Sequence, residues 1–327
     1  MEVFTTTSTI VYHMEADRYI PGSVMYTDNY SLKTSNGSGS EIIAGNTTER
    51  GYKEDAGSDA RFTGIRGFTQ ISRTRVVVSD SWNYCLRLVN RANGMTSQFA
   101  GQCTKYGGYT GGFTFPQSII RDVKKTRQLI VCESNAKVIR TVDIRNGTLA
   151  TFVDLDFYVN RVYQLKKSGD LIMPNQNKVL RCDYQSKETS VLIDSVVKGY
   201  WDGPFQYSLF DTLKYITILD RGSLLVVDEG SKRIRILDFD LNQTETLLVQ
   251  DCESNSDAVQ HTSCRTIPNI TSVLVTKDTL FIGGNSRITS GMSCLLLSYA
   301  SYANKTCLRC TVVCVAGFQE ISKACET

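Results

Sequence analysis

A strand-like pattern recurs along the chain at separations of 41 to 55 residues. Each copy is a short apolar run closed by one polar or turn residue, and the clearest copies read VVVSD, LIVCE and LLVVD. The closing residues are Asp28, Asp80, Glu133, Pro174, Asp228 and Gly283. A unit repeated at this period buries its apolar faces by packing against its neighbours. The chain is therefore predicted to fold as a series of similar sheets.

One repeat contains four short strands. In residues 68–100, strand-forming segments alternate with turn residues, among them the pair Asn93-Gly94 that is typical of a hairpin. The second strand, at residues 76–78, is continuously apolar, as expected when both faces of a sheet are covered. Six such units predict an all-β fold, a six-bladed β-propeller with four strands in each blade.

A basic residue accompanies the closing residue in most repeats. Seven residues further on, the third strand carries Arg87, Arg140, Arg181 and Arg235. An exposed row of arginines would indicate a phosphate-binding surface. Their fixed place within the repeat favours pairing inside each blade instead, and the recurrent aspartates are expected to cap turns.

Two further segments repeat in a second register, at nearly the same period. EIIAGN at residues 41–46 reappears as SQFAGQ at 97–102, and FTGIRGF at 62–68 reappears as FTFPQSI at 113–119. Together with VVVSDSWNYCLRLV and the Asn-Gly turn, these segments resemble the NHL repeat of six-bladed propellers, most closely over residues 40–155. Families with this architecture include peptide-amidating lyases, RNA-binding regulators and extracellular adhesion modules. The resemblance therefore implies a fold but does not choose a function.

The propeller is expected to occupy residues 1–303. Residues 2–8 resemble a fourth strand and are predicted to close the sixth blade, beside residues 280–283 and 294–298, with residues 10–13 as the innermost strand of the first blade. The alternative is a free polar tail. Met1-Glu2-Val3 begins no signal peptide, so a secreted protein would contain this chain as part of a longer precursor.

Cysteines concentrate toward the C-terminus. Residues 304–327 are predicted to begin a cysteine-rich or EGF-like module, because four cysteines follow one another at the spacing C-x2-C-x3-C-x10-C. A zinc site at the CxxC is disfavoured, since no second pair follows at zinc-finger spacing. Two further cysteines bracket a polar loop and are expected to form a local disulfide. The six disulfide candidates are Cys252, Cys264, Cys307, Cys310, Cys314 and Cys325.

Seven N-x-S/T sequons are present. In a secreted chain each marks an exposed site for N-glycosylation. The candidate residues are Asn29, Asn36, Asn46, Asn146, Asn242, Asn269 and Asn304.

Few residues are suited to catalysis. The only histidines are His13 and His261, too few for the multi-histidine zinc centre of the amidating lyases, and neither adjoins a nucleophile motif. We therefore expect no catalytic cofactor. The sequence also allows a structural calcium ion in the central channel, because oxygen ligands from several blades are available. They are Asp154, Asp156, Asn160, Asp202, Asp211 and Asp220.

The longest departure from the repeat lies at residues 195–213. This segment holds Tyr200, Trp201, Phe205, Tyr207 and Phe210. The aromatic rings either pack over a blade edge or form a contact surface for protein or glycan.

The charge and composition argue against two classes of binding partner. The formal net charge of +3 is too small to imply nucleic acid or a membrane surface, and no apolar run is long enough for a transmembrane helix. With the sequons and the cysteines, these properties predict a secreted, extracellular structural or adhesive module that binds other proteins or glycans, or assembles with itself into a filament. The alternatives are a propeller hydrolase or lyase with a metal in its channel and, third, an RNA-binding NHL domain.

Overall fold

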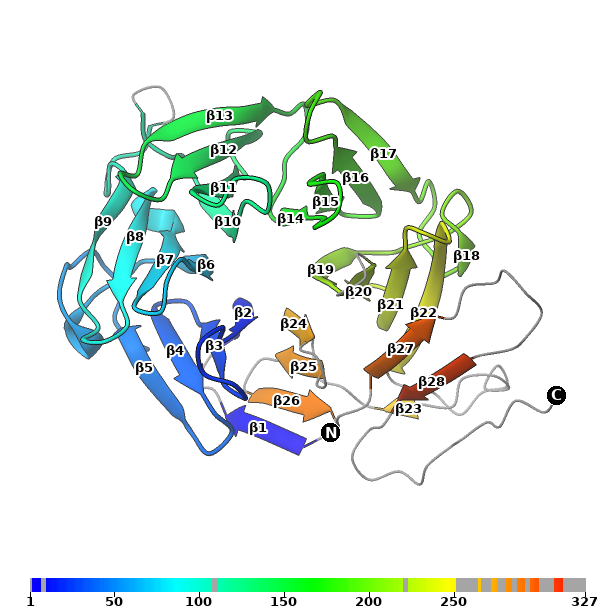
Figure 1. Ribbon diagram of the computed structural model, residues 1–327, viewed down its shortest axis with the longest axis horizontal. Helices are drawn as coiled ribbons and strands as arrows, with labels where there is room; N and C mark the ends of the chain where they lie inside the picture. The colour runs from blue at the N-terminus through cyan, green and yellow to red at the C-terminus, as the bar shows by residue number, and fades with distance from the viewer. Residues whose placement is uncertain are drawn as a thin grey trace.

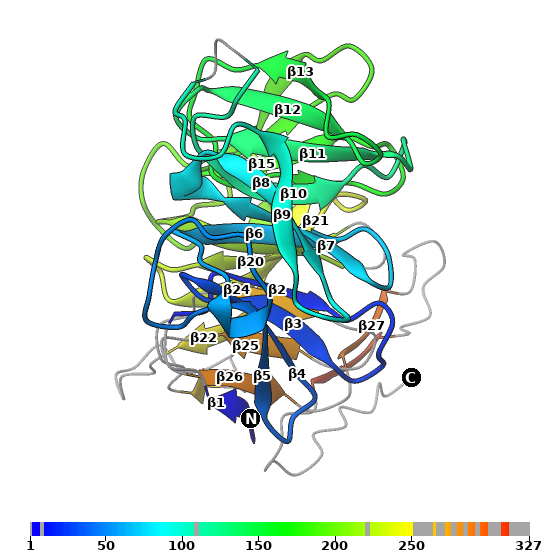
Figure 2. The same cartoon turned by 90° about the vertical axis from the view of Figure 1, so that its left-hand side faces the viewer.

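The computed structural model describes residues 2–6, 10–107, 111–219 and 223–250, and further strand segments at 264–265, 272–275, 280–283, 287–291, 295–299 and 309–313. Twisted sheets stand around a common centre, with β2, β6, β10, β14, β19 and β24 innermost (Figure 1). In the view turned by 90°, the strands of neighbouring sheets lie one above another (Figure 2). The chain is an all-β propeller, as the sequence predicts.

Four blades follow the repeat in chain order, each an antiparallel sheet paired in sequence order. Blade 1 contains β2 (His13–Ala16), β3 (Val24–Thr27), β4 (Ser31–Ser35) and β5 (Ser40–Gly45). Blade 2 contains β6 (Ile65–Gln70), β7 (Arg75–Asp80), β8 (Cys85–Asn90) and β9 (Thr96–Gly101). Blade 3 contains β10 (Pro116–Arg121), β11 (Gln128–Glu133), β12 (Val138–Asp143) and β13 (Leu149–Asp154). Blade 4 contains β14 (Tyr163–Gln164), β15 (Leu171–Asn175), β16 (Lys178–Cys182) and β17 (Thr189–Asp194).

The remaining sheets depart from the repeat. Blade 5 contains β19 (Leu213–Ile218), β20 (Leu224–Asp228), β21 (Arg233–Asp238) and β22 (Gln243–Gln250), and the short strands β18 (Gly203–Pro204) and β23 (Cys264–Arg265) pair with β22. The closing sheet combines β1 (Glu2–Thr6) with β24 (Ser272–Val275), β25 (Leu280–Gly283) and β26 (Arg287–Gly291). β27 (Leu295–Tyr299) and β28 (Arg309–Val313) form a separate antiparallel pair.

Three expectations are therefore wrong in detail. In the described part of the chain five sheets have four strands, not six, because β18 and β23 enlarge blade 5 to six strands. Of the predicted segment 294–298, residues 295–298 do not belong to the closing sheet, because β27 pairs with β28 instead, and residue 294 lies outside the described residues. The innermost strand of blade 1 begins at His13, so residues 10–12 precede it.

The core lies between the blades. In β7, Val76 and Val78 pack with the apolar side chains of blade 1, whereas Val77 faces the opposite way and packs with those of blade 3. All three valines are fully buried. This explains the continuous apolar run in the second strand, since a strand covered on both faces has no side that needs polar residues.

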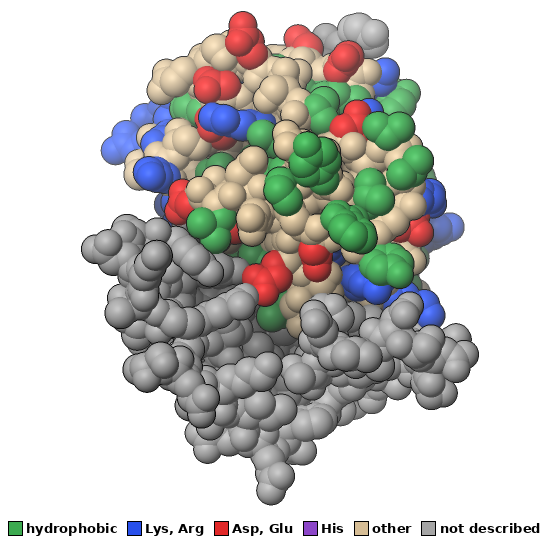
Figure 3. All heavy atoms as spheres, turned by 90° about the vertical axis from the view of Figure 1, so that its right-hand side faces the viewer, with side chains coloured by type: hydrophobic (Ala, Val, Ile, Leu, Met, Phe, Trp, Pro, Cys, Tyr) green, Lys and Arg blue, Asp and Glu red, His purple; other side chains and the backbone are tan. Residues whose placement is uncertain are grey.

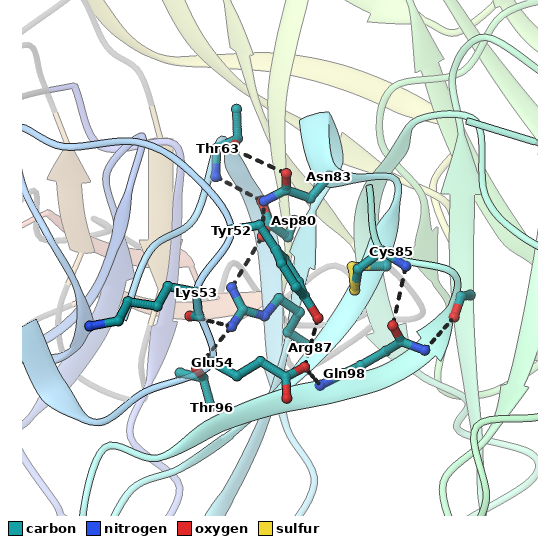
Figure 4. Close-up of a disulfide and its surroundings, with 12 residues drawn as sticks. Tyr52, Lys53, Glu54, Thr63, Asp80, Asn83, Cys85, Arg87, Thr96 and Gln98 are labelled. Atoms are coloured by element: carbon teal, nitrogen blue, oxygen red, sulfur yellow. Dashed lines mark hydrogen bonds and ion pairs between the residues drawn. A yellow bond between two sulfur atoms is a disulfide. The ribbon is translucent and has the colours of Figure 1, made fainter. Parts of the chain in front are cut away.

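A buried carboxylate links the beginning of blade 2 to its middle strands (Figure 4). Asp80, at the end of β7, accepts hydrogen bonds from the backbone N–H groups of Thr63 (3.0 Å) and Gly64 (3.3 Å). The guanidinium of Arg87 lies 3.5 Å from Asp80 and donates to the carbonyls of Arg61 (2.6 Å) and Lys53 (2.8 Å). Both charged side chains are fully buried. The sequence prediction of internal pairing is confirmed here.

Blade 3 repeats this arrangement. Glu133 accepts from the backbone N–H of Thr114 (2.6 Å) and from Nε of Arg140 (2.8 Å). The carboxylate thus ties the loop before the first strand to the third strand, as in blade 2.

Blade 5 keeps the arrangement and blade 4 alters it. Asp228 accepts from the backbone N–H of Thr212 (2.9 Å), with Arg235 at 3.6 Å. In blade 4 the carboxylate is replaced by Pro174, and Arg181 pairs with Asp170 at 2.5 Å instead.

The two segments of the second register contact each other. Gly45 and Gly101 end the outermost strands of blades 1 and 2 with positive φ angles of 100° and 79°. Each lies against a buried ring of the next repeat, Phe62 and Phe113 respectively. The repeated Ala-Gly and Phe-Thr pairs are therefore two sides of one inter-blade contact.

β1 completes the closing sheet by pairing antiparallel with β26, with Glu2 opposite Ser290 and Thr6 opposite Arg287. Deleting residues 1–8 would leave β26 as an unpaired edge, which is a template for association with other chains. We expect the truncated protein to melt several degrees lower and to form dimers or larger species, measured by calorimetry and light scattering. An unchanged melting temperature with a monomer would contradict this expectation.

One disulfide is present among the described residues, between Cys85 and Cys103. It joins the start of β8 to the segment just after β9, beside the Asp80–Arg87 pair (Figure 4). This pair is not among the six candidates predicted from the sequence, which come from a polar loop and from the C-terminal cluster of cysteines. Of the six predicted disulfide candidates, only the backbone of Cys264 and Cys310 is described, and the other four lie outside the described residues.

Candidate functional site

A cavity of about 730 Å³ opens at the centre of the ring, on the face where the innermost strands begin. We call it the mouth. Its lining comes from the starts of innermost strands, from turns between second and third strands, and from loops between blades. The lining residues are Tyr12, Arg66, Gln117, Lys137, Asp156, Phe157, Tyr158, Asn160, Arg161, Pro174, Asn175, Gln176, Thr212, Leu213 and Tyr215.

Irregular strand pairing brings some of these residues to the mouth. The register between β6 and β7 shifts at Arg66, between Ile65 and Gly67. The register between β10 and β11 shifts between Pro116 and Ile119, a segment that contains Gln117. Such a bulge leaves a residue without a partner and changes the direction of its side chain. Arg66 and Gln117 therefore line the mouth although they lie at strand starts.

Two arginines meet at Tyr12. The guanidinium carbon of Arg66 lies 4.2 Å from the centre of the Tyr12 ring, in a cation–π contact. Arg161 donates a hydrogen bond of 2.6 Å to the backbone carbonyl of Tyr12 and lies 5.1 Å from the ring centre of Tyr215. These contacts connect Tyr12, just before blade 1, with residues of blade 2, of the loop before blade 4 and of blade 5.

Lys137 adds a third cation. It occupies the turn between β11 and β12 in the left-handed region, with φ of 51°. Its Nζ donates to the backbone carbonyl of Asp156 (3.1 Å) and lies 4.7 Å from the ring centre of Tyr158. The ammonium is therefore held by a carbonyl and a ring rather than by a carboxylate.

The mouth carries unbalanced positive charge. It has three cations, Arg66, Lys137 and Arg161, against one carboxylate, that of Asp156. Among the described residues none of the three cations forms an ion pair with a carboxylate, unlike Arg87 or Arg235 inside the blades. A concave site lined by one sign of charge focuses its field and attracts ligands of the opposite charge.

His13 follows Tyr12 of the mouth, and its ring packs against neighbouring side chains. Its ring is partly buried, meets Phe68 edge-on at 4.9 Å, and has Nε2 at 3.7 Å from Glu15. Its Nδ1 lies 3.5 Å from Arg161. These contacts agree with the structural role expected from the sequence. His261 lies outside the described residues.

The acidic residues considered for a channel ion are dispersed. Asp156 and Asn160 line the mouth, whereas Asp202 pairs with Arg235 and Asp211 with Lys198. Within the described ranges, no three His, Cys, Asp or Glu side chains form a cluster suited to a metal. Asp154 is exposed at the end of β13, and Asp220 is outside the described residues.

Of the cysteines whose side chains the structure describes, two are buried and free of disulfides, Cys132 and Cys182. Burial raises the pKa of Cys132 to about 12 and that of Cys182 to about 11. Both are therefore protonated at neutral pH, and a protonated thiol is a poor nucleophile. They fill the core as small apolar side chains.

The aromatic loop divides into two parts. Phe205 and Phe210 are 4% and 0% exposed and belong to the core between blades 4 and 5, whereas Tyr200, Trp201 and Tyr207 are 58%, 66% and 63% exposed. On the side of the ring that carries β17 and β18, hydrophobic side chains gather at the surface (Figure 3). The packing interpretation therefore holds for Phe205 and Phe210, and the contact-surface interpretation stays a prediction for the three exposed rings.

Five of the seven sequons lie among the described residues, at turns and strand ends. Asn36, Asn146 and Asn242 are exposed, and Asn29 and Asn46 are partly buried. Asn269 and Asn304 lie outside the described residues.

Most mouth residues were not predicted from the sequence. Asp156 and Asn160 were considered only as metal ligands, and Arg66, Lys137 and Arg161 were not considered. A usable signal exists for Arg66 and Gln117, which occupy equivalent places four residues after Phe62 and Phe113 in the second register. Arg161 has no such marker, because the loop before β14 departs from the repeat.

Comparison with known proteins agrees on the fold. No protein-family model matches the sequence, and no curated protein matches it. An auxiliary nutrient binding protein from Bacteroides thetaiotaomicron VPI-5482 is similar with a TM-score of 0.64 and 9% identity, over 87% of this chain and 70% of that chain. For streptogramin B lyase the TM-score is 0.55 and the identity 13%, over 86% of this chain and 78% of that chain. For a chain of a nidogen/laminin complex the TM-score is 0.55 and the identity 10%, over 79% of this chain and 83% of that chain.

These similarities define the class of protein as a β-propeller, and at such identities they extend to the fold alone. Within the part of the chain that the structure describes, no helix has the length and apolar character of a membrane span.

Proposed function

We propose that this chain is a non-enzymatic extracellular binding module whose ligand site is the mouth. The observation that carries the proposal is the set of unpaired cations around a cavity of about 730 Å³. Ligand sites are concave and combine a largely formed cavity with a few directed polar groups. The buried arginines inside the blades are paired with carboxylates, whereas the cations of the mouth form no ion pair with a described carboxylate.

An extracellular location is supported by two features. The disulfide between Cys85 and Cys103 requires an oxidising environment to persist. Five sequons lie on described turns and strand ends, and the asparagines of three of them are exposed. The proposal includes glycosylation at these sites, an NHL-type origin of the repeats, and a cysteine-rich module from residue 304.

A binding role fits the chemistry of the residues better than turnover does. The two free thiols are protonated at neutral pH, and His13 is engaged with Phe68 and Arg161. The exposed rings of Tyr200, Trp201 and Tyr207 would provide a second contact surface, for a protein partner or another copy of the chain.

The test is a binding screen of the purified chain against arrays of extracellular proteins and glycans. We expect at least one ligand whose binding is lost in the double variant Arg66→Gln/Arg161→Gln. The variant Lys178→Ala, which alters an exposed ion pair with Asp194, is the control and should bind as the wild type does. Ligand binding that the double variant retains would show that the mouth is not the site. A hydrolase activity abolished by chelator would overturn the proposed class of function.

A further inference from the structure

We infer that the mouth binds an acidic saccharide, a sugar chain that carries carboxylate or sulfate groups. This inference rests on the proposed function and names the ligand class of the same site. It combines three properties of the mouth. Its cations form no ion pair with a described carboxylate, four side-chain amides form no hydrogen bond to a described residue, and the aromatic rings contact cations.

The cations favour oxyanions. The side chain of Arg66 makes no hydrogen bond within the described residues, and its contact there is with the ring of Tyr12. A guanidinium offers parallel N–H donors that match the two oxygens of a carboxylate or sulfate. Arg161 uses one donor on the backbone carbonyl of Tyr12 and lies 3.5 Å from Nδ1 of His13, Lys137 uses one donor on the carbonyl of Asp156, and both retain further donors. The mouth therefore presents donors from three separate elements.

The amides favour hydroxyl groups. Four side-chain amides line the mouth and make no hydrogen bond to another described residue; they belong to Gln117, Asn160, Asn175 and Gln176. An amide both donates and accepts, as a sugar hydroxyl does, so the two can pair in either direction. An acidic peptide would use the cations but leave most of these amides without partners.

Other ligand classes fit less well. Single-stranded nucleic acid stacks its bases on aromatic faces. In the mouth the rings of Tyr12, Tyr158 and Tyr215 are each in contact with a cation. A protein ligand would anchor a large side chain in an apolar pocket. The apolar lining here is confined to Phe157, Pro174 and Leu213 among polar neighbours.

The test uses calorimetric titration of the full chain with four probes of similar length. They are a galacturonate trisaccharide, its methyl ester, a sulfated trisaccharide and an acidic peptide. We expect the acid or the sulfated sugar to bind at least tenfold more tightly than the neutral ester and the peptide. Which of the two binds more tightly identifies carboxylate or sulfate as the preferred group. Affinity for charged probes should fall as salt rises.

The variants locate the site. Arg66→Gln should weaken binding of the acidic sugar at least tenfold without changing the melting temperature, since Arg66 makes no hydrogen bond to another described residue. Lys137→Asn should also weaken it, because Asn tolerates the left-handed backbone while removing the charge. Lys178→Ala should have no effect.

Three results of the titrations would overturn the inference: an ester that binds as tightly as both acidic sugars, tighter binding of the peptide, or no binding of either acidic sugar. If the ester or the peptide binds and Arg66→Gln abolishes that binding, the mouth remains a binding site and only the ligand class is wrong. If the acidic sugar binds and Arg66→Gln leaves its affinity unchanged, the site itself is wrong.

Discussion

The variant Asp80→Ala is expected to be less stable than the wild type by about 3–5 kcal/mol, because it removes one partner of a fully buried ion pair. The guanidinium of Arg87 would keep its bonds to the carbonyls of Lys53 and Arg61 but would have no counter-charge. The backbone N–H groups of Thr63 and Gly64 would also lose their acceptor. Urea unfolding followed by tryptophan fluorescence measures the change.

Two companion variants separate charge from hydrogen bonding. Asp80→Asn retains an oxygen for the two N–H groups and should lose less stability than Asp80→Ala. Lys178→Ala disrupts an exposed pair and should change the free energy of unfolding by less than about 1 kcal/mol. Equal stability of Asp80→Ala and Lys178→Ala would show that the buried pair does not stabilise the blade.

The second large effect is expected for Gly101→Ala. Residue 101 has φ of 79°, a conformation that costs an L-residue roughly 1–2 kcal/mol. A β-carbon there would lie 2.7 Å from Cδ2 of Phe113, so the ring or the strand must shift, which adds about 1–3 kcal/mol as overpacking does. We expect a total loss of about 2–5 kcal/mol, measured by the same unfolding experiment.

Gly39→Ala is the matched control. An added β-carbon at this residue would have no atom within 4 Å, and its φ lies outside the left-handed range. The control should unfold as the wild type does. If Gly101→Ala were equally stable, the contact between the repeated Ala-Gly and Phe-Thr segments would not be a determinant of blade packing.

The sequence predicts the blades well where each residue meets the same neighbours in every repeat. Asp80 and Arg87 recur at a fixed spacing because one lies at the end of β7 and the other in β8, the strand paired with it, so their contact is local. The apolar second strand is predictable for the same reason. The strands β18 and β23 were missed because each spans two residues and arises from pairing to the edge of β22, which leaves no periodic pattern.

The mouth could not be predicted in the same way because its residues are neighbours only after the ring has formed. Tyr12 and Arg161 are 149 positions apart in the sequence yet share a hydrogen bond. The aromatic loop shows a related limit, since Phe210 and Trp201 have similar apolar character but opposite exposure. Exposure there depends on which ring faces the core between blades 4 and 5.

The three cations of the mouth come from different parts of the ring: Arg66 from blade 2, Lys137 from blade 3, and Arg161 from the loop that precedes blade 4. A single blade buries its apolar faces only against its neighbours, and it supplies at most one of these three cations. A ligand that binds the closed ring alone therefore adds RT ln(1 + [L]/Kd) to the free energy that holds the ring together. Occupancy of the mouth and closure of the ring are thermodynamically linked, so a fragment lacking any of these segments would lose ligand affinity together with circular integrity.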